Sequence, residues 1–252
     1  MSGTSWDPAA YLAFADHRAR PFHDLLARVS VSAPRHVVDL GCGPGNLTAL
    51  LGRRWPNARV TALDSSAEMV DAARERGVDA HRGDVATWTP TPDTDVVVSN
   101  AVLHWVPSHR ELLPRWLAAL PGGAELALQV PANFRSPSHV LARELAAERD
   151  LVLRDGTAVA EPAEYAALLA GVAAHVDVWE TTYVQRLTGP DPVLEWIGST
   201  TLRPVRDALD DAEYAAFRAE LAPRLRAAYP EQPDGTTWFP FRRIFAVARV
   251  PR

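Results

Sequence analysis

The feature that most constrains this chain is a glycine-rich segment that directly follows a short apolar run. Residues His36 to Leu40 have the sequence His-Val-Val-Asp-Leu, and Gly41, Gly43 and Gly45 follow at alternate positions. The apolar run predicts a buried strand. The glycines allow a sharp turn in which the backbone approaches a ligand closely. The next segment, Leu47 to Arg54, has helical spacing, so the order is strand, glycine loop and helix.

Strand and helix patterns then alternate along the chain. Further strands are predicted over Arg59–Leu63, Val78–His81, Asp95–Ser99 and Ala124–Val130. Helices are predicted over Ser65–Arg76, with Ser65 as the N-cap and Glu68 completing a capping box, and over Glu111–Leu120. This alternation favours a doubly wound α/β domain, in which a mostly parallel sheet is covered by helices on both faces.

After Val130 the alternation stops. The remaining patterns predict helices over Ser138–Leu153, Pro162–Leu169, Pro192–Gly198 and Ala208–Tyr229, and strands over Val176–Leu187 and Phe241–Val250. We therefore expect one domain over residues 1–252. Residues 1–34, with a helix from Pro8 to Val29, would form an N-terminal lid. Residues 35–130 would form the ligand-binding core, and residues 131–252 would add cap helices and the last two strands.

Composition limits the function. The 252 residues suffice for one large domain, and a net charge of −5 gives no indication of a nucleic-acid partner. The single cysteine, Cys42, excludes an intrachain disulfide. A single cysteine suits a reducing cytoplasm, and the sequence has no recognisable signal peptide or membrane-spanning run. We expect a cytoplasmic protein and a monomer. The histidines lack the spacing of a metal site. All 26 basic residues are arginines, so anionic ligands must be met by guanidinium groups, backbone amides or neutral donors.

Acidic residues follow three of the predicted strands. Asp39 precedes the glycine loop, Asp64 ends the second strand, and Asp84 follows the third. Ligands of open α/β sheets bind at this edge. Asp64 could accept both ribose hydroxyls of a nucleoside, and Asp84 an amine, while Val85 contacts an adenine face. Position 46 is Asn46, where the dinucleotide fingerprint G-x-G-x-x-G requires glycine.

The choice of cofactor then depends on charge. Asp39 would repel a diphosphate and attract the cationic amino end of S-adenosylmethionine. The pattern therefore favours a methyl donor over a nicotinamide dinucleotide, although an oxidoreductase stays the alternative from a different class of enzyme.

Residues 37–46, Val-Val-Asp-Leu-Gly-Cys-Gly-Pro-Gly-Asn, resemble the first motif of class I S-adenosylmethionine-dependent methyltransferases. The resemblance places Asp64 at the ribose, Asp84 near the adenine and Asn100 at the methionine part of the donor. It implies a Rossmann-like, seven-stranded sheet with the last strand antiparallel. The residues that we expect to contact the donor are Asp39, Gly41, Cys42, Gly43, Asn46, Asp64, Ser65, Met69, Asp84, Val85, Asn100 and Trp105.

A narrower resemblance spans nearly the whole length. The chain is similar to the trans-aconitate 2-methyltransferase family in Trp6-Asp-Pro-x-x-Tyr11, Asn100-Ala-x-Leu-x-Trp105, Gly198-x-Thr-x-Leu202-Arg203-Pro204 and Phe239-Pro240-x-Arg242. The resemblance implies methyl transfer to a carboxylate of trans-aconitate, giving a monomethyl ester and S-adenosylhomocysteine. A carboxylate is ionised at pH 7, so no general base is required.

Recognition of a small tricarboxylate requires cationic and neutral donors. Arginine binds carboxylates bidentately, and the candidates that we favour most are Arg203 and Arg20. The further candidates are Arg18, Arg242 and Arg243, with Tyr11, Tyr183, His104 and Trp196 as walls or neutral donors. Two alternatives remain within this frame: methylation of another carboxylate, such as a malonyl thioester on a carrier protein, and donor binding without catalysis.

Overall fold

The computed structural model describes residues 15–252, with side chains from residue 19 onward. Its sheet has seven strands in the order β3-β2-β1-β4-β5-β7-β6. The strands are β1 (His36–Leu40), β2 (Arg59–Asp64), β3 (Asp79–Arg82), β4 (Thr94–Asn100), β5 (Glu125–Pro131), β6 (His175–Thr188) and β7 (Thr236–Arg249). Each predicted strand is present.

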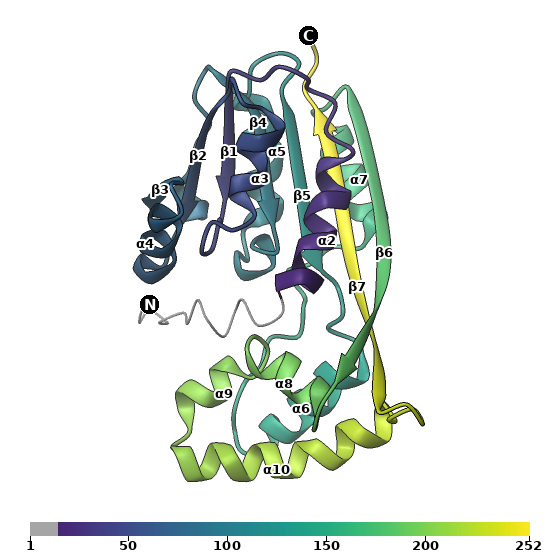
Figure 1. Cartoon of the computed structure of the whole chain (residues 1–252). Helices are drawn as coiled ribbons and strands as arrows, with labels where there is room; N and C mark the ends of the chain where they lie inside the picture. The colour runs from purple at the N-terminus through teal and green to yellow at the C-terminus, as the bar shows by residue number, and fades with distance from the viewer. Residues whose placement is uncertain (1–14) are drawn as a thin grey trace. The chain divides into compact units, whose positions relative to one another are not determined.

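The first five strands are parallel to their neighbours. Strand β7 runs antiparallel to β5, because the N–H of Ala132 donates to the carbonyl of Arg242 while that of Val250 donates to the carbonyl of Ala124. The predicted fold class, a mostly parallel seven-stranded sheet with an antiparallel last strand, is confirmed (Figure 1).

Helices occupy most of the connections between strands. They are α2 (Ala15–Leu26), α3 (Thr48–Arg54), α4 (Ala67–Glu75), α5 (His109–Ala119), α6 (Pro137–Ala147), α7 (Pro162–Ala170), α8 (Pro192–Gly198), α9 (Arg203–Ala208) and α10 (Asp211–Ala228). Two short 3-10 turns, η1 (Val85–Thr87) and η2 (Leu103–Trp105), follow β3 and β4. Between residues 15 and 252, no helix combines the length and apolar character needed to cross a membrane.

The chain forms two compact units. The first comprises the residues up to Val130, with Ala158–Glu180 and Ile244–Arg252, and the second comprises Pro131–Thr157 and Thr181–Arg243. In the first unit, α2 and α3 lie in front of the sheet and α5 and α7 lie behind it (Figure 1). The second unit contains α6, α8, α9 and α10 together with the adjoining parts of β6 and β7.

Each unit has its own buried core. In the first, the central strands bury Leu40, Val97 and Leu128, which are completely inaccessible to solvent. In the second, Leu145 of α6 and Phe217 of α10 are equally buried, so the helices after Val130 pack around apolar side chains of their own. Burying large apolar side chains supplies most of the stability of such units.

The largest differences from the predicted helix boundaries concern two helices after Val130. The helix predicted over Ala208–Tyr229 begins later, at Asp211, because Asp210 is the N-cap of α10, and the short helix α9 (Arg203–Ala208) before it was not predicted. The Asp210 carboxylate accepts the N–H of Glu213 at 2.8 Å, and the Glu213 carboxylate accepts the N–H of Asp210 at 3.0 Å. This capping box makes residue 210 a start rather than an interior position.

The helix predicted over Ser138–Leu153 ends at Ala147 instead. Asp150 has a φ of 55°, and the N–H of Leu151 donates back to the carbonyl of Ala146 at 3.0 Å. Such a left-handed residue ends a helix. Strand β7 begins at Thr236, five residues before its predicted start, and includes Pro240, which has no backbone N–H to donate.

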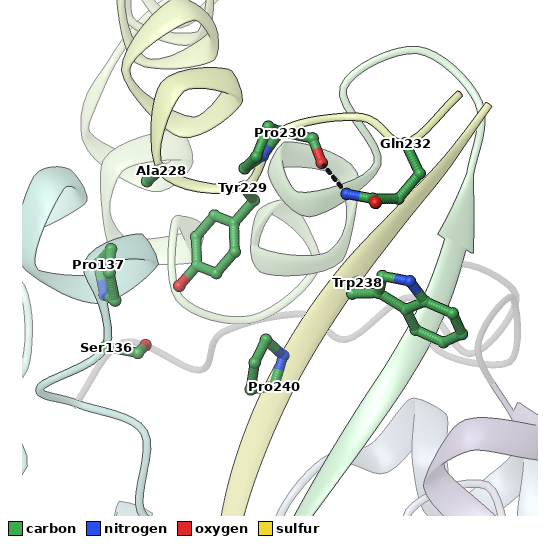
Figure 2. Close-up of a pocket in the computed structure, with 8 residues that line it drawn as sticks. All are labelled: Ser136, Pro137, Ala228, Tyr229, Pro230, Gln232, Trp238 and Pro240. Atoms are coloured by element: carbon green, nitrogen blue, oxygen red, sulfur yellow. Dashed lines mark hydrogen bonds between the residues drawn. The ribbon is translucent and has the colours of Figure 1, made fainter. Parts of the chain in front are cut away.

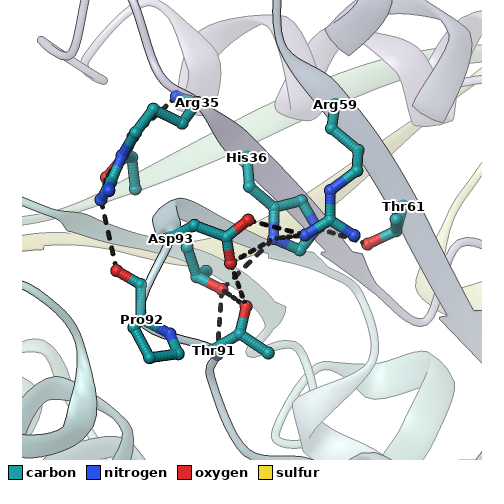
Figure 3. A network of polar contacts seen from close by, with 9 residues as sticks. Arg35, His36, Arg59, Thr61, Thr91, Pro92 and Asp93 are labelled. Atoms are coloured by element: carbon teal, nitrogen blue, oxygen red, sulfur yellow. Dashed lines mark hydrogen bonds and ion pairs between the residues drawn. The ribbon is translucent and has the colours of Figure 1, made fainter.

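A polar network joins the amino ends of β1, β2 and β4, opposite the glycine loop (Figure 3). The imidazole of His36, 4% exposed, accepts from the guanidinium of Arg59 at 3.0 Å through Nδ1. Its Nε2–H therefore donates to the hydroxyl of Thr61, 2.8 Å away. Arg59 also pairs with Asp93 at 2.8 Å. Burial, and then the charge of Arg59, lower the pKa of His36.

The lowered pKa of His36 gives an expected pH dependence of stability. Below about pH 6.5 an unfolded histidine binds a proton that the buried native imidazole excludes. The free energy of unfolding should therefore fall as pH drops from 7.5 to 5.5, by at most ~1.4 kcal/mol per pH unit from this group. In His36→Gln the fall should be smaller, as measured by urea unfolding at several pH values.

The matched control is His81→Gln, because the side chain of His81 is 61% exposed. This variant should retain the wild-type pH dependence of stability. An identical loss of stability in the wild type and in His36→Gln would contradict the assignment.

Candidate active site

The polar residues that follow the parallel strands lie along one edge of the sheet in the first unit. Asp39 is paired with Ala62 in the β1–β2 register, and Asp64 with Arg82 in the β2–β3 register. Asn100 ends β4, next to β1. The glycine loop, Asp64, the segment after β3 and Asn100 therefore meet at the carboxyl edge, where open α/β sheets bind ligands.

Two glycines of the loop are required by close packing. Gly41 has a φ of 82°, and a Cβ there would lie 2.1 Å from a methyl carbon of Val102. Gly45 has a φ of 76°, and its Cβ would lie 2.8 Å from that of Ala73. At Gly43, by contrast, a Cβ would meet no atom of the described residues within 4 Å, so among these residues the loop is open at its middle. A ligand can approach the backbone there.

A buried carboxylate lies beneath the loop. Asp39 is 3% exposed and accepts a hydrogen bond of 2.6 Å from the hydroxyl of Thr48, the first residue of α3. Burial raises the pKa of Asp39 to about 6, the charge of Asp64 acts in the same direction, and the hydrogen bond from Thr48 opposes both. The unit thus holds a carboxylate whose ionised form is costly until a cation approaches.

Asp64 holds the loop to the start of α4. Its carboxylate accepts the N–H of Gly43 at 2.9 Å and that of Ser66 at 3.0 Å. Burial raises the pKa of Asp64, and hydrogen bonds from backbone N–H groups, including that of Ser65, oppose the rise. Each carboxylate oxygen has two lone pairs, so both can still accept ribose hydroxyls.

The N-cap of α4 is Ser66, so the prediction of Ser65 is wrong by one residue. The hydroxyl of Ser66 accepts the N–H of Met69 at 3.3 Å and donates to Glu68 at 2.6 Å. The reason is that Asp64 engages the backbone N–H groups of residues 65 and 66, which delays the first helical residue to Ala67. Ser65 is exposed, whereas Met69 is 3% exposed.

Other expected donor contacts differ in their exposure. Asp84 is exposed and caps η1, where it accepts the N–H of Ala86 at 2.8 Å, and Val85 beside it is buried. Asn46 is half-buried at the end of the loop. Cys42 is buried, and burial together with the charges of Asp39 and Asp64 raises the pKa of its thiol. It is therefore a neutral, small side chain.

Asn100 presents a buried oxygen without a hydrogen bond. Among the described residues, no donor reaches its Oδ1, although this atom is shielded from solvent. A buried acceptor left unpaired is costly, so its presence at a strand end points to a donor group supplied by a ligand. The next residue, Ala101, has a φ of 58°, a backbone conformation that residues other than glycine rarely adopt.

Val102 is the residue of this edge that sequence reasoning missed. Its side chain occupies the space that a Cβ at Gly41 would need, so it fixes the glycine loop from the β4 side. No signal in the pattern of residues 100–105 distinguishes it from an ordinary apolar position, because the contact depends on β1 and β4 being neighbours.

The predicted acceptor residues of the first unit are only partly described. Tyr11 and the side chain of Arg18 lie outside the described residues. Arg20 is exposed on α2. His104 and Trp105 are half-buried in η2, directly after β4, with ring centroids 5.3 Å apart. This places both rings on the segment that leaves the edge of the sheet.

The second unit holds the other predicted acceptor residues. Arg203 is half-buried at the start of α9, and Arg242 is half-buried on β7. Tyr183 is 3% exposed, and Trp196 is 2% exposed. The indole of Trp196 packs against Phe239 and Phe241, with centroids at 5.8 and 5.6 Å, so it belongs to the core of this unit.

Arg243 is more buried than Arg242. Its side chain is on the opposite side of β7, 5% exposed, with the guanidinium 4.8 Å from the ring centroid of Phe241. Side chains of a strand alternate, so the two arginines do not point to the same side of β7 and cannot act together on one ligand.

A cavity of about 390 Å³ opens in the second unit between α10, the start of α6 and β7 (Figure 2). It is lined by Ser136, Pro137, Ala228, Tyr229, Pro230, Gln232, Trp238 and Pro240. None of these residues is charged, so the cavity has no cation with which to bind a tricarboxylate.

The carboxyl edge of the first unit can therefore bind a cationic nucleoside. Two carboxylates with raised pKa values lie at or beneath the loop, and a positive ligand would stabilise their ionised forms. A diphosphate at the same place would meet negative charge. The geometry thus favours a sulfonium amino acid over a dinucleotide.

Comparisons with known proteins agree with this geometry. A family model described as a methyltransferase domain matches residues 37–123. The trans-aconitate 2-methyltransferase of Rhodococcus jostii (strain RHA1) is 63% identical, over 97% of this chain and 99% of that protein. The enzyme of the same name from Mycobacterium sp. (strain KMS) is 60% identical over the same shares of both chains.

Solved structures show the same fold at much lower identity. Phosphoethanolamine N-methyltransferase 2 of Haemonchus contortus, solved in complex with S-adenosyl-L-methionine, superposes with a TM-score of 0.60 and 16% identity, over 97% of this chain and 57% of that one. The YcgJ protein of Bacillus subtilis gives a TM-score of 0.59 at 15% identity, over 94% and 99% of the two chains. On the full-length identity to its relatives, the chain belongs to the trans-aconitate 2-methyltransferase family.

Proposed function

We propose that this protein transfers the methyl group of S-adenosylmethionine to a carboxylate of trans-aconitate, releasing the monomethyl ester and S-adenosylhomocysteine. The observation that carries the proposal is the acidic carboxyl edge of the first unit, in a chain 63% identical to an enzyme of that name. The predicted monomeric state and cytoplasmic location stay predictions.

Each polar residue of the carboxyl edge pairs with one group of the methyl donor. Asp64 accepts the ribose hydroxyls, Asp84 the adenine amine, and Val85 contacts the adenine face. The cationic amino end lies toward Asp39, and one of its N–H groups donates to the unpaired Oδ1 of Asn100. This arrangement pairs the buried oxygen and offsets the cost of ionising Asp39.

The reaction needs alignment more than acid–base chemistry. One carboxylate oxygen of the acceptor attacks the methyl carbon, the bond from that carbon to sulfur breaks, and its electron pair stays on sulfur. The acceptor is ionised at neutral pH, so no proton has to move. The protein has to hold oxygen, carbon and sulfur in line, and positioning of this kind supplies much of the rate of such a transfer.

Arginines bind the acceptor. Trans-aconitate carries three carboxylates, and the chain has no lysine, so guanidinium groups supply the countercharge. Arg203 at the start of α9 is the first candidate, with Arg20, Arg18 and Arg242 as the others. Tyr183, His104 and Tyr11 supply walls or neutral donors, whereas Trp196 belongs to the core of the second unit.

The direct test is incubation with labelled S-adenosylmethionine and trans-aconitate, with the ester identified by mass spectrometry. Isocitrate, citrate and a malonyl thioester serve as competing acceptors. Failure to form the trans-aconitate ester, with donor binding intact by calorimetry, would remove this acceptor and leave a methyltransferase of another substrate.

Replacing Asp64 should weaken donor binding. In Asp64→Ala the ribose hydroxyls lose a charged acceptor, which costs about 1.5–3 kcal/mol, or roughly 10- to 150-fold in affinity. Calorimetric titration with S-adenosylhomocysteine measures the change. Asp71→Ala on α4, whose side chain is 70% exposed, is the control and should bind normally. An unchanged dissociation constant in Asp64→Ala would show that the carboxylate does not meet the ribose.

Protonation of Asp39 should also weaken donor binding. The pKa of this group is about 6, so it loses its charge as pH falls from 7.5 to 5.5, and the cationic amino end loses its partner. The dissociation constant should rise on the acid side of about pH 6, by up to about tenfold per pH unit. In Asp39→Asn, which keeps an acceptor for Thr48, binding should be weaker at pH 7.5 and nearly constant to pH 5.5. A wild-type pH profile in this variant would refute the role of Asp39.

Removing the guanidinium of Arg203 should affect only the acceptor. Arg203→Ala should raise the KM for trans-aconitate about tenfold or more, since a charge-assisted bond contributes about 1.5–3 kcal/mol. The affinity for the donor should stay unchanged. Arg206→Ala is the control on the same helix, because Arg206 pairs with Asp211 at the surface. Equal damage to both ligands would identify Arg203 as a structural residue.

A further inference from the structure

A buried polar cluster in the second unit takes no part in the chemistry described so far. It is built around His139 in the first turn of α6, whose side chain is 6% exposed. The hydroxyl of Ser138 lies 3.1 Å from its Nδ1, and the hydroxyl of Thr201 lies 3.0 Å from its Nε2. The amide nitrogen of Asn133 lies within 3.4 Å of the same ring. The cluster thus joins residues 62 positions apart in the sequence.

The imidazole of His139 is neutral. Burial lowers its pKa to about 3, and the charges of Arg143 and Arg154 act in the same direction. A neutral ring has one N–H and one acceptor nitrogen, and hydroxyl groups can serve either. The hydrogen bonds to Ser138 and Thr201 therefore persist over the whole range in which an enzyme of this kind works, and His139 exchanges no proton with a substrate.

The partner of His139 lies in the turn that leads into α9. Thr201 precedes Leu202, which is completely buried and whose N–H donates to the carbonyl of Ile197 at 3.0 Å. Arg203 follows as the first residue of α9. Two side chains therefore fix the backbone just before Arg203. Leu202 is buried in the apolar core, and the hydroxyl of Thr201 contacts His139.

Apolar side chains in place of His139 and Thr201 could also pack α6 against this turn, but they would not fix the orientation of the turn relative to α6. A satisfied hydrogen-bond network, in contrast, selects one arrangement of the elements that it joins. Such precision matters most beside a residue that must meet a substrate group, because a displacement of about 1 Å can cost roughly 100-fold in rate. Arg203 is the residue of this turn with that task.

We propose that the hydrogen bond between Thr201 and His139 positions Arg203 for the acceptor, so that Thr201 and His139 are positioning residues for carboxylate recognition. The inference rests on the proposed function, in which Arg203 binds trans-aconitate. It adds that the geometry of the arginine is set from α6, through a neutral histidine.

The test is a pair of substitutions at Thr201. Thr201→Val keeps the size of the side chain and removes the hydroxyl, whereas Thr201→Ser keeps the hydroxyl and removes the methyl group. We expect Thr201→Val to raise the KM for trans-aconitate about tenfold or more, with the affinity for S-adenosylhomocysteine within twofold of the wild type. Thr201→Ser should restore most of the loss.

Thr200→Val is the matched control, because it makes the same change one residue earlier. The described hydrogen bonds of Thr200 use its backbone N–H, which donates to the carbonyl of Ile197, and its carbonyl, which accepts from the N–H of Arg203, rather than its hydroxyl. Melting temperatures of all variants show whether the second unit stays folded. A wild-type KM in Thr201→Val would overturn the inference. So would equal impairment of the valine and serine variants, or a parallel loss of donor binding, since each is the result of a purely structural hydroxyl.

Arg203→Ala, measured in the same series, separates this inference from the function on which it rests. If the wild type makes no trans-aconitate ester, the proposed function fails and the inference fails with it. If Arg203→Ala has a wild-type KM, the assignment of Arg203 is wrong and Thr201 has nothing to position. If Arg203→Ala is impaired and Thr201→Val is not, the positioning role alone is refuted.

Discussion

The carboxyl edge of the first unit, where the methyl donor is proposed to bind, depends on the buried carboxylate of Asp39 beneath the glycine loop. The hydrogen bond from Thr48 ties the end of β1 to the start of α3, and the loop between them has to turn within a few residues. Asp64 then holds the middle of the loop through the N–H of Gly43. Together the two carboxylates fix the loop and give it negative charge, so one arrangement serves both folding and recognition.

The candidate donor and acceptor residues carry opposite charges, which suits the proposed reaction. The donor edge is acidic and matches a sulfonium amino acid, whereas the candidate acceptor residues of the second unit include Arg203 and Arg242. A methyl cation equivalent passes from a positive donor to a negative acceptor, so the reacting pair loses both charges. The polar cluster around His139 stays neutral and therefore adds no charge near the acceptor residues.

Much of the fold could be predicted because its signals are local. The apolar runs of the parallel strands and the glycines after β1 depend on neighbours in the sequence, and every predicted strand is present. The errors include the start of β7 and the helix ends at Ser66, Ala147 and Asp210, where one or two hydrogen bonds or one left-handed residue decide the helix boundary. Patterns of apolar spacing do not register such events.

The sequence by itself determined the class of fold, the acidic residues at the strand ends and the family. Only the tertiary structure decided that Val102 lies against Gly41, that Oδ1 of Asn100 is buried without a partner among residues 15–252, and that His139 meets Thr201. The physical reason is that spacing along the chain records which faces of an element are buried. It does not record which distant side chain fills the space beside them, because that depends on how the packed elements meet.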